Sequence, residues 1–271
     1  MVCFPNAKIN LGLNIVSKRG DGYHNLETIF YPIAIQDALE VVPSKDDKDS
    51  FVEAGIRVDA QPENNLVMKA LLLMREYHSI PPVEVHLLKK IPFGAGIGGG
   101  SADAAFMLKL LNEMFFLKMT DNDLSKLAVR LGADCPFFIY NRPMFARGVG
   151  EQLEDINLSL DKYYLVLVKP DIHIPTRDAF ALIQPVEPEL SLKEIIKFPV
   201  RDWVDSMCND FEKSIFPKYP AIEKIKEKLY DLGAAYASMS GSGSSVYGIF
   251  DQKPNIKEEF PDCYVWEEEK A

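Results

Sequence analysis

Five of the sixteen glycines fall within residues 94–100, inside the stretch PFGAGIGGGSADAA at 92–105. Glycine loses more backbone entropy on folding than any other residue, so a hydrophobic core gains nothing from such a cluster. The gain lies in backbone N–H groups with no side chain in front of them, which can line a concave site for an anion. A predicted strand at 83–90 precedes this glycine belt, residues 94–100, and a predicted helix at 102–116 follows it. A strand, a glycine loop and a helix N-terminus in series predict a site for nucleotide phosphates.

Other glycine loops require residues or strands that this stretch does not supply. The P-loop pattern needs a lysine before the hydroxyl residue, but Gly100 precedes Ser101 here. The belt does contain one G-x-G-x-x-G match, the dinucleotide pattern, which requires a buried parallel strand before it. Residues 83–87 instead alternate apolar and polar, which is typical of an antiparallel sheet with one solvated face. The dinucleotide site and a connector that binds nothing are the two alternatives to a nucleotide-phosphate loop.

The composition is that of a globular protein, with 47% hydrophobic and 26% charged residues among 271. No stretch approaches 18 uninterrupted apolar residues, so no membrane span is expected. The N-terminus lacks the layout of a signal peptide, and we expect a cytoplasmic protein. A net charge of −10 argues against a nucleic-acid surface. The four cysteines are scattered without C-x-x-C spacing, which predicts reduced thiols and neither a disulfide framework nor a zinc site.

The chain opens with a strongly alternating segment. Apolar residues occupy the odd positions from 9 to 15, and Lys8 and Asn10 are neighbours on the opposite face. A period of two predicts a strand. Turn residues at 20–22 predict a hairpin with a second strand at 24–35, which puts Tyr23 and His24 at the turn. Taken alone, each of these polar residues is compatible with an ordinary surface role.

Further strands are predicted at 38–42 and 51–58, and helices at 65–78 and 121–131. The second helix is followed by Gly132-Ala133-Asp134-Cys135-Pro136. Because Pro136 disfavours helical geometry at Cys135, we expect Asp134 in a turn before an apolar strand at 137–140. A carboxylate at the negative end of a helix dipole requires a nearby positive charge, unless it only caps a turn.

A strand at 163–168 begins the second half of the chain. A short helix is predicted from about 176 to 183, and helical patterns follow at 190–196, 203–215 and 221–232. A second loop of small residues, SMSGSGSS at 238–245, precedes a strand at 246–250. Eight small residues exceed what a turn needs and indicate close approach by another backbone or a ligand.

Three of these stretches, P-x-A-K-I-N near the start, PFGAGIGGGSADAA and SGSGSS, resemble the three ordered motifs of the GHMP small-molecule kinases over nearly the whole chain. The resemblance implies an α/β fold of the α+β type with two lobes. An N-terminal ATP-binding domain at 1–153 would contain a mixed sheet similar to the second domain of ribosomal protein S5. A C-terminal domain at 154–271 would form an α/β sandwich.

Three further segments are similar to one branch of that family: DGYH at 21–24, LGADCP at 131–136 and IPT at 174–176. Members of this branch use ATP and Mg²⁺ to phosphorylate the 2-hydroxyl of a cytidine-diphosphate-linked methylerythritol, in the non-mevalonate route to isoprenoid precursors. The resemblance therefore implies a small-molecule kinase, acting as a monomer or weak homodimer. Two alternatives are a homoserine or mevalonate kinase, which would lack DGYH, and a catalytically silent nucleotide sensor, which the retention of Lys8 and Asp134 disfavours.

The resemblance also implies a role for each matching residue. Asp134 would accept or orient the proton of the acceptor hydroxyl. Lys8 would lower the pKa of that hydroxyl and stabilise charge near the transferred phosphoryl group. Such a sparse pair suffices because phosphoryl transfer depends mostly on positioning and charge stabilisation. The implied ATP-binding residues are Asn65, near the adenine, Pro92, Gly94, Gly96, Gly98, Gly99, Gly100 and Ser101.

The implied acceptor site combines aromatic and small residues. Tyr23 and Phe180 would sandwich the cytosine ring, and His24 would hydrogen-bond to its edge. The remaining implied acceptor-binding residues are Asn10, Thr176, Ser240, Gly241, Ser242 and Gly243. The implied Mg²⁺ contact is Ser101, because Ala102 stands where a second serine is frequent in the family. Ala95 also replaces a common glycine, and we expect it to fit with a negative φ.

Overall fold

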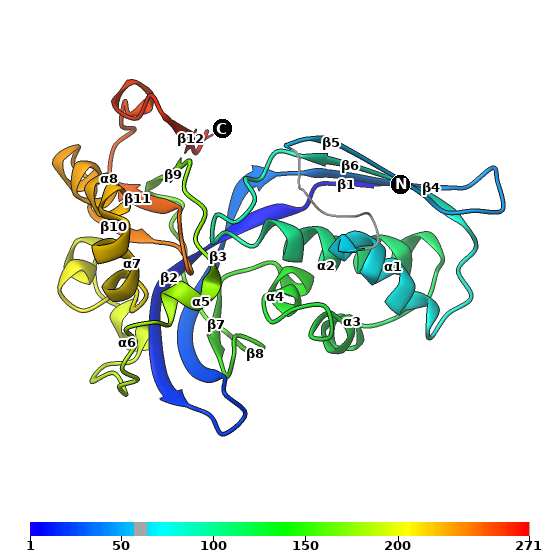
Figure 1. Ribbon diagram of the computed structural model, residues 1–271, viewed down its shortest axis with the longest axis horizontal. Coiled ribbons are helices and arrows are strands. Elements are labelled where there is room, and N and C mark those ends of the chain that lie inside the picture. Colours follow the sequence, from blue (N-terminus) through cyan, green and yellow to red (C-terminus); the bar gives the residue numbers. More distant parts are fainter. Residues whose placement is uncertain (57–63, 271) are drawn as a thin grey trace. The chain divides into compact units, whose positions relative to one another are not determined.

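The computed structural model describes residues 1–56 and 64–270, which form two compact units (Figure 1). Unit 1 consists of Met1–Lys8, Pro32–Phe93 and Gly98–Arg142, and unit 2 consists of Ile9–Tyr31, Gly94–Ile97 and Pro143–Ala271. These units are discontinuous in sequence, whereas the predicted domains are continuous; a domain boundary at residue 153 stays a prediction. Residues 57 and 58 of the strand predicted at 51–58 lie outside the described residues.

The sheet of unit 1 has the strand order β1-β4-β6-β5. Its strands are β1 (Val2–Cys3), β4 (Ala38–Pro43), β6 (Val83–Lys89) and β5 (Ser50–Gly55). β6 is antiparallel to β4, with Val41 opposite Val85, and parallel to β5. The sheet is therefore mixed, as the family resemblance implies. The antiparallel pairing indicated by the alternation of residues 83–87 is found with β4 only, because β5 runs parallel to β6. The alternation of β6 turns Val85, Leu87 and finally Lys89 to the buried face, so the last inward position of the strand is an ammonium group.

Four helices complete unit 1, and Figure 1 shows α1 and α2 along one face of its sheet. They are α1 (Leu66–Arg75), α2 (Gly99–Met114), α3 (Asp121–Ala128) and α4 (Cys135–Tyr140). Asn65 caps α1 through its side chain, as predicted, and Thr120 forms a capping box at α3. α2 begins three residues earlier than predicted. Its first turn therefore contains the last two glycines of the belt and Ser101.

The strand predicted at 137–140 is wrong, because these residues form helix α4. Pro136 lies in the first turn of this helix, where its missing N–H has no intrahelical partner to lose and its fixed φ suits the helix. A short apolar run that is buried all round has no periodicity that separates helix from strand. The consequence for the site is direct. Asp134 lies at the N-terminus of a helix, where the dipole favours a carboxylate.

A second sheet, with the order β2-β3-β7-β8, contains the two longest strands. These strands are β2 (Asn6–Lys18) and β3 (His24–Gln36), which are followed in the sheet by β7 (Met144–Arg147) and β8 (Gln152–Asp155). β7 pairs antiparallel with both β3 and β8, with Ile29 opposite Phe145. The predicted hairpin at 20–22 is confirmed, and β2 carries both Lys8 and Asn10.

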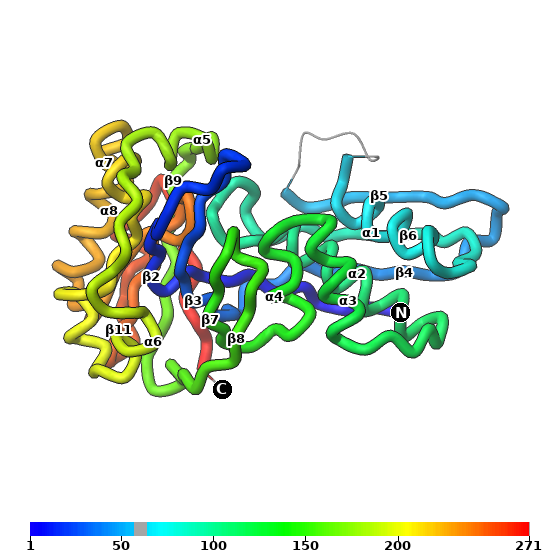
Figure 2. Tube along the Cα trace, turned by 90° about the horizontal axis from the view of Figure 1, so that it is seen from below, coloured from blue at the N-terminus to red at the C-terminus, as the bar shows by residue number. Residues whose placement is uncertain are grey.

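The remaining sheet belongs to unit 2 and is antiparallel throughout, in the order β10-β11-β9-β12. Its strands are β10 (Tyr236–Met239), β11 (Val246–Phe250), β9 (Tyr164–Pro170) and β12 (Cys263–Glu267). Figure 2 shows α7 (Glu212–Lys218) and α8 (Pro220–Asp231) beside this sheet. The core between them includes Val168, Ile215, Ile222 and Leu229, all fully buried. The other helices here are α5 (Thr176–Ala179), α6 (Leu192–Ile195) and the 3₁₀ helices η2 (Val200–Asp205) and η3 (Lys257–Glu259).

The single helix predicted at 203–215 is also wrong. The chain forms η2 and α7 instead, with residues 207–210 outside both helices. Asn209 and Asp210 are residues whose side chains compete with helical hydrogen bonds. This break places the Asn209 side chain inside unit 2, where it makes the contacts described below.

All four cysteines are free thiols, as predicted. Among the described residues, no helix combines the length and the apolar character needed to cross a membrane.

Candidate active site

Lys8 and Asp134 form an ion pair within unit 1, with Lys8 Nζ 3.3 Å from Asp134 Oδ2. The Lys8 side chain is 4% exposed, whereas that of Asp134 is 34% exposed. Lys8 is buried because it lies on the continuous strand β2, and Asp134 is reachable because it precedes α4 and makes no capping hydrogen bond. Here the positive charge that the sequence required near Asp134 is found. The pair offers a ligand a partly exposed carboxyl group beside a buried lysine side chain.

The C-terminal end of the glycine belt packs directly on this pair. Gly98 has a φ of 73°, and a Cβ there would lie 2.9 Å from Phe138 Cζ and 3.2 Å from Lys8 Cε. A side chain at this position would be strained, would collide with Phe138 and would be tightly packed against Lys8. Gly98 is the N-cap of α2, and its carbonyl accepts the first bond of that helix, from Ala102. The amides of Gly99, Gly100 and Ser101 therefore belong to the first turn, where N–H groups have no intrahelical partner.

Ser101 lies close to Cys135, the first residue of α4. Its hydroxyl hydrogen-bonds to the thiol of Cys135, the residue that follows Asp134. Burial raises the pKa of the Cys135 thiol to about 12, against a lowering effect of Ser101, so this cysteine is a neutral neighbour and no nucleophile. Among the described residues, no group of three or more His, Cys, Asp or Glu side chains is placed to bind a metal. Mg²⁺ is commonly held by one or two carboxylates together with substrate phosphates, and Asp134 and Ser101 are oxygen donors of that kind.

The entrance to the belt is fixed by a buried charge cluster that the sequence analysis did not identify. Asp37 accepts hydrogen bonds from the N–H groups of Lys90 (2.5 Å) and Ile91 (2.8 Å), and it forms an ion pair with Lys89. Lys89 Nζ also lies 2.6 Å from Oδ2 of Asp103, in the second turn of α2. The three charged side chains are almost completely buried. They connect the residues before the belt to the helix after it, and the inward position of Lys89 in the alternation of β6 was the available signal.

Asn65 and Pro92, two of the predicted ATP-binding residues, also belong to unit 1. Asn65 Oδ1 accepts the N–H of Val67 at 2.9 Å, and Nδ2 donates to Glu53 Oε2 at 3.1 Å. Its side-chain amide thus holds the start of α1 against β5. Pro92 is buried directly after the charge cluster. Contact of either residue with a nucleotide stays a prediction.

In unit 2, the belt segment Gly94–Ile97 contacts the second small-residue loop. Gly96 has a φ of 73°, and a Cβ there would lie 2.1 Å from the carbonyl oxygen of Ser240. The Ser240 hydroxyl donates to Gly96 O at 2.9 Å and accepts the N–H of Asn10 at 3.2 Å. Ala95 O accepts the N–H of Ser245, and Ala95 is not among the residues with positive φ, as expected. The close approach predicted for residues 238–245 is therefore confirmed, and the partner is the belt.

Asn10 and the loop glycines complete this contact. The Asn10 side chain donates to Thr28 Oγ1 at 3.0 Å, and a Cβ on Gly241 would lie 3.3 Å from Asn10 Oδ1. Gly241 and Gly243 have φ values of 54° and 83°, and Ser242 is half-buried between them. Asn10 and this loop are thus in contact, whereas their binding to an acceptor stays a prediction.

The predicted aromatic site is arranged differently from the expected sandwich. The rings of His24 and Phe180 stack at 5.0 Å with an interplanar angle of 21°, and Phe180 also meets Phe211 edge-on at 4.8 Å. Tyr23 is 65% exposed, and Thr176 is exposed at the start of α5. The sandwich of cytosine between Tyr23 and Phe180 stays a prediction. In the structure, the Phe180 ring stacks on the ring of His24.

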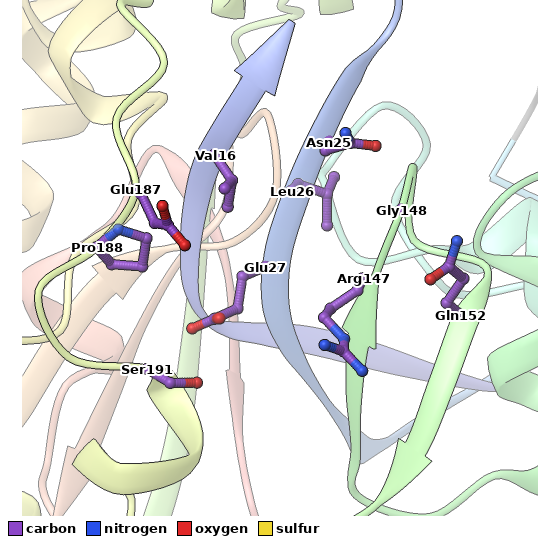
Figure 3. Close-up of a pocket in the computed structure, with 10 residues that line it drawn as sticks. All are labelled: Val16, Asn25, Leu26, Glu27, Arg147, Gly148, Gln152, Glu187, Pro188 and Ser191. Carbon is purple, nitrogen blue, oxygen red and sulfur yellow. The ribbon is translucent and has the colours of Figure 1, made fainter. Parts of the chain in front are cut away.

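Unit 2 also contains a cavity of about 560 Å³ (Figure 3). Its lining includes the buried carboxylate of Glu27, which accepts the N–H of Leu192 at 2.6 Å, and the guanidinium of Arg147. The predicted site residues are not among the residues that line it.

A helix that begins in a glycine belt, beside a buried ammonium paired with a reachable carboxylate, is the arrangement of a phosphotransferase acting on small molecules. Comparison with known proteins agrees with this class. Residues 65–142 match the model of the GHMP kinases N terminal domain, and residues 193–265 match that of the GHMP kinases C terminal domain. The chain belongs to the GHMP kinases.

Individual relatives are similar over nearly the full length. A 4-diphosphocytidyl-2-C-methyl-D-erythritol kinase of Parabacteroides distasonis is 58% identical over 98% of both chains, and one of Bacteroides fragilis is 57% identical over 99% of both. A crystal structure of 4-(cytidine 5'-diphospho)-2C-methyl-D-erythritol kinase matches with a TM-score of 0.82 and 30% identity, over 98% of both chains. A homoserine kinase from Cytophaga hutchinsonii, at 19% identity and a TM-score of 0.68, shares the fold over 97% of this chain and 94% of its own.

Proposed function

We propose that this chain is an ATP-dependent kinase that phosphorylates the 2-hydroxyl of 4-diphosphocytidyl-2-C-methyl-D-erythritol. The observation that carries the proposal is the Lys8–Asp134 pair, at 3.3 Å, in a chain 58% identical to a relative with that name. Relatives at this identity over 98% of both chains commonly share a reaction, and the ion pair of Lys8 and Asp134 supports the roles proposed for these two residues. A silent nucleotide sensor would have no use for a reachable carboxylate at this position.

The two members of the pair have different tasks in this proposal. Asp134, with about a third of its side chain exposed, accepts or orients the proton of the acceptor hydroxyl. Lys8, held in place by β2 and by Gly98, stabilises negative charge near the transferred phosphoryl group. Bound ATP supplies that group. The amides of Gly99, Gly100 and Ser101 at the start of α2 bind its phosphates, together with the belt glycines before them.

Mg²⁺ is the divalent cation proposed for this site, since hard oxygen donors are what it prefers. Ser101 is the protein ligand implied by the family resemblance, and Asp134 precedes Cys135, the residue to which Ser101 hydrogen-bonds. Ala102 is buried on α2 and provides no second hydroxyl. A cytoplasmic location and a monomeric or weakly dimeric state stay predictions from the sequence.

The acceptor determinants proposed for unit 2 are Asn10, Tyr23, His24, Thr176, Phe180 and the loop Ser240–Gly243. The stacked rings of His24 and Phe180 form an aromatic surface at which a pyrimidine can stack or hydrogen-bond. The exposed Tyr23 ring, next to His24 in the sequence, provides a second aromatic face. These features distinguish a cytidyl acceptor from the small aliphatic acceptors of other GHMP kinases.

An ADP-release assay across three acceptors tests the function. We expect the purified chain with ATP and Mg²⁺ to turn over 4-diphosphocytidyl-2-C-methyl-D-erythritol at least about 100-fold more efficiently than homoserine or mevalonate. A hundredfold difference corresponds to about 2.7 kcal/mol of discrimination, the scale of a few hydrogen bonds and one stacked base. Equal or better turnover of homoserine or mevalonate would contradict the proposal, and ATP binding without turnover of any acceptor would favour the sensor.

A further inference from the structure

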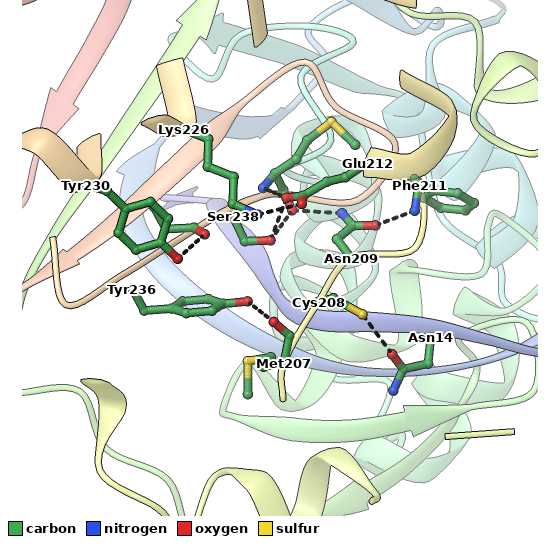
Figure 4. A network of polar contacts seen from close by, with 12 residues as sticks. Asn14, Met207, Cys208, Asn209, Phe211, Glu212, Lys226, Tyr230, Tyr236 and Ser238 are labelled. Carbon is green, nitrogen blue, oxygen red and sulfur yellow. Dashed lines mark hydrogen bonds and ion pairs between the residues drawn. The ribbon is translucent and has the colours of Figure 1, made fainter. Parts of the chain in front are cut away.

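The segment between η2 and α7 contacts the second small-residue loop through one buried side chain, Asn209 (Figure 4). Asn209 is 2% exposed, and its Nδ2 donates to the carbonyl oxygens of both Met239 and Gly241, each at 2.8 Å. Its Oδ1 accepts the N–H of Phe211 at 3.0 Å. Both amide hydrogens of the side chain are thus used on the backbone of the loop.

The neighbouring Glu212 holds the strand that leads into the loop. Its Oε1 accepts the Ser238 hydroxyl at 2.9 Å and the N–H of Met239 at 2.8 Å, and Oε2 lies 2.6 Å from Lys226 Nζ. Figure 4 shows these groups converging on the end of β10. Glu212 therefore fixes the last residues of the strand, whereas Asn209 also reaches past it to Gly241.

Asn209 is itself fixed to the strand that carries Asn10. The N–H of Leu13 donates to Cys208 O, and the N–H of Asp210 donates to Leu13 O, both at 2.8 Å. The Asp210 carboxylate accepts the N–H of Ile15 at 2.7 Å. The residues on both sides of Asn209 are thus bound to β2, which makes its side chain a rigid reference for the loop.

Holding the Gly241 carbonyl also orients the rest of its peptide unit. The unit is planar, and in the trans form the N–H points opposite to the C=O. The carbonyl of Gly241 points to Asn209, so the N–H of Ser242 points away from it. Glycine at 241, with a φ of 54°, would otherwise let this peptide rotate easily.

We propose that Asn209 is a positioning residue that orients the Gly241–Ser242 peptide, so that the N–H of Ser242 donates to an anionic phosphate oxygen of the acceptor. The inference rests on the proposed function, in which residues 240–243 contact an acceptor that carries a diphosphate. Asn209 itself does not touch the acceptor. Its effect therefore falls on acceptor affinity and not on ATP affinity.

Steady-state kinetics of Asn209→Ala, with Glu212→Gln as the matched control, test the proposal. Asn209→Ala removes both bonds to the loop carbonyls, and we expect the KM for the cytidyl acceptor to rise about tenfold while the KM for ATP changes less than about twofold. Glu212→Gln keeps an oxygen that can accept from Ser238 and Met239 and loses only the ion pair with Lys226. It is expected to lower Tm while the acceptor KM stays at the wild-type value.

Equal increases of both KM values in Asn209→Ala, or an unchanged acceptor KM, would overturn the proposal. A purely structural role would instead make the two variants lose activity in parallel with stability. If the wild type prefers another acceptor, the proposed function has failed, and the same comparison is then made with that acceptor to test Asn209 separately.

A measurement on the wild type avoids any variant that fails to fold. The amide proton of Ser242 is followed by NMR while the cytidyl acceptor is added without ATP. A new hydrogen bond to a phosphate oxygen is expected to shift this resonance downfield, more than those of its loop neighbours. A Ser242 resonance that does not move at saturating acceptor would contradict the proposed donor.

Discussion

At the scale of single residues, the site depends on unequal exposure within pairs of interacting groups. The Lys8 ammonium is buried and its partner Asp134 is partly open to solvent. His24 and Phe180 stack, while Tyr23, one residue away from His24, is 65% exposed. The buried side chain of each set fixes the position of its partner, and the exposed side chain can contact a ligand. The exposed member of each set is therefore where a substitution acts on function with little effect on stability.

Tyr23→Ala tests the aromatic assignment at this scale. Because the ring is exposed, we expect Tm to change by less than about 2 °C. Loss of one stacking face for cytosine should raise the KM for the cytidyl acceptor about tenfold, within the range measured for base–aromatic stacking. Tyr77→Ala is the control, since Tyr77 is also exposed (58%) and its hydroxyl accepts a hydrogen bond from Arg130 at 2.8 Å. An increase in the KM for ATP in place of that for the acceptor would discard the assignment.

At the scale of elements, three charged side chains join β6, the β3–β4 connection and α2 around the start of the glycine belt. Within residues 1–56 and 64–270, Asp37 has three hydrogen-bonded partners, whereas Asp103 has Lys89 for Oδ2 and no partner for the buried Oδ1. Two carboxylates share one ammonium in a buried site. Burial raises the pKa of Asp103 to about 7, against the lowering effect of Lys89.

The raised pKa predicts how the stability of the protein depends on pH. In the unfolded chain Asp103 titrates near 4, so between about pH 4 and pH 7 the folded protein binds more protons, and its stability falls as pH rises. Asp103→Asn cannot titrate. We expect the free energy of unfolding of the wild type, minus that of Asp103→Asn, to decrease from pH 4 to pH 7 and to level off above about pH 8. Urea denaturation of both proteins across this range measures the difference; an increase with pH would contradict it.

Asp37→Asn is the matched comparison within the same cluster. It disturbs the acceptor of two backbone amides as well as the ion pair with Lys89, so a loss of about 3 kcal/mol at pH 7 is expected. Asp103→Asn should cost less than about 1 kcal/mol at that pH, because Lys89 keeps Asp37 as a partner. Equal losses of unfolding free energy in the two variants would show that the hydrogen bonds of Asp37 to the backbone before the belt do not contribute to stability.

At the scale of the whole molecule, the sequence predicted most of the secondary structure and the family. Clear signals carried these predictions: the Asn65 cap, the alternation of β2 and β6, and the glycine belt. The two errors, at 137–140 and 203–215, have separate causes. The first segment is buried all round and has no period, and the second is interrupted by Asn209 and Asp210, whose local hydrogen bonds outweigh the helical pattern.

The sequence predicted the site residues that belong to recognisable motifs, and not the residues that support them. The belt was predicted from its own glycines, and the roles of Lys8 and Asp134 come from the family resemblance. The sequence contains no distance between Lys8 and Asp134, which are 126 positions apart. The supporting contacts of Asp37, Lys89 and Asn209 are tertiary, so they could not be found from local pattern. An inward lysine at the end of β6 and an Asn-Asp pair inside a predicted helix were signals that something there required explanation.

The turnover of Asp134→Asn tests the central claim most directly, since that claim gives the Asp134 carboxylate a role in the chemical step beside Lys8. The substitution keeps the size of the side chain and the start of α4. We expect kcat with ATP and the cytidyl acceptor to fall at least about 100-fold, the scale of general-base catalysis, while the Kd for ATP changes less than about threefold. Turnover near the wild-type value in a folded variant would contradict the account.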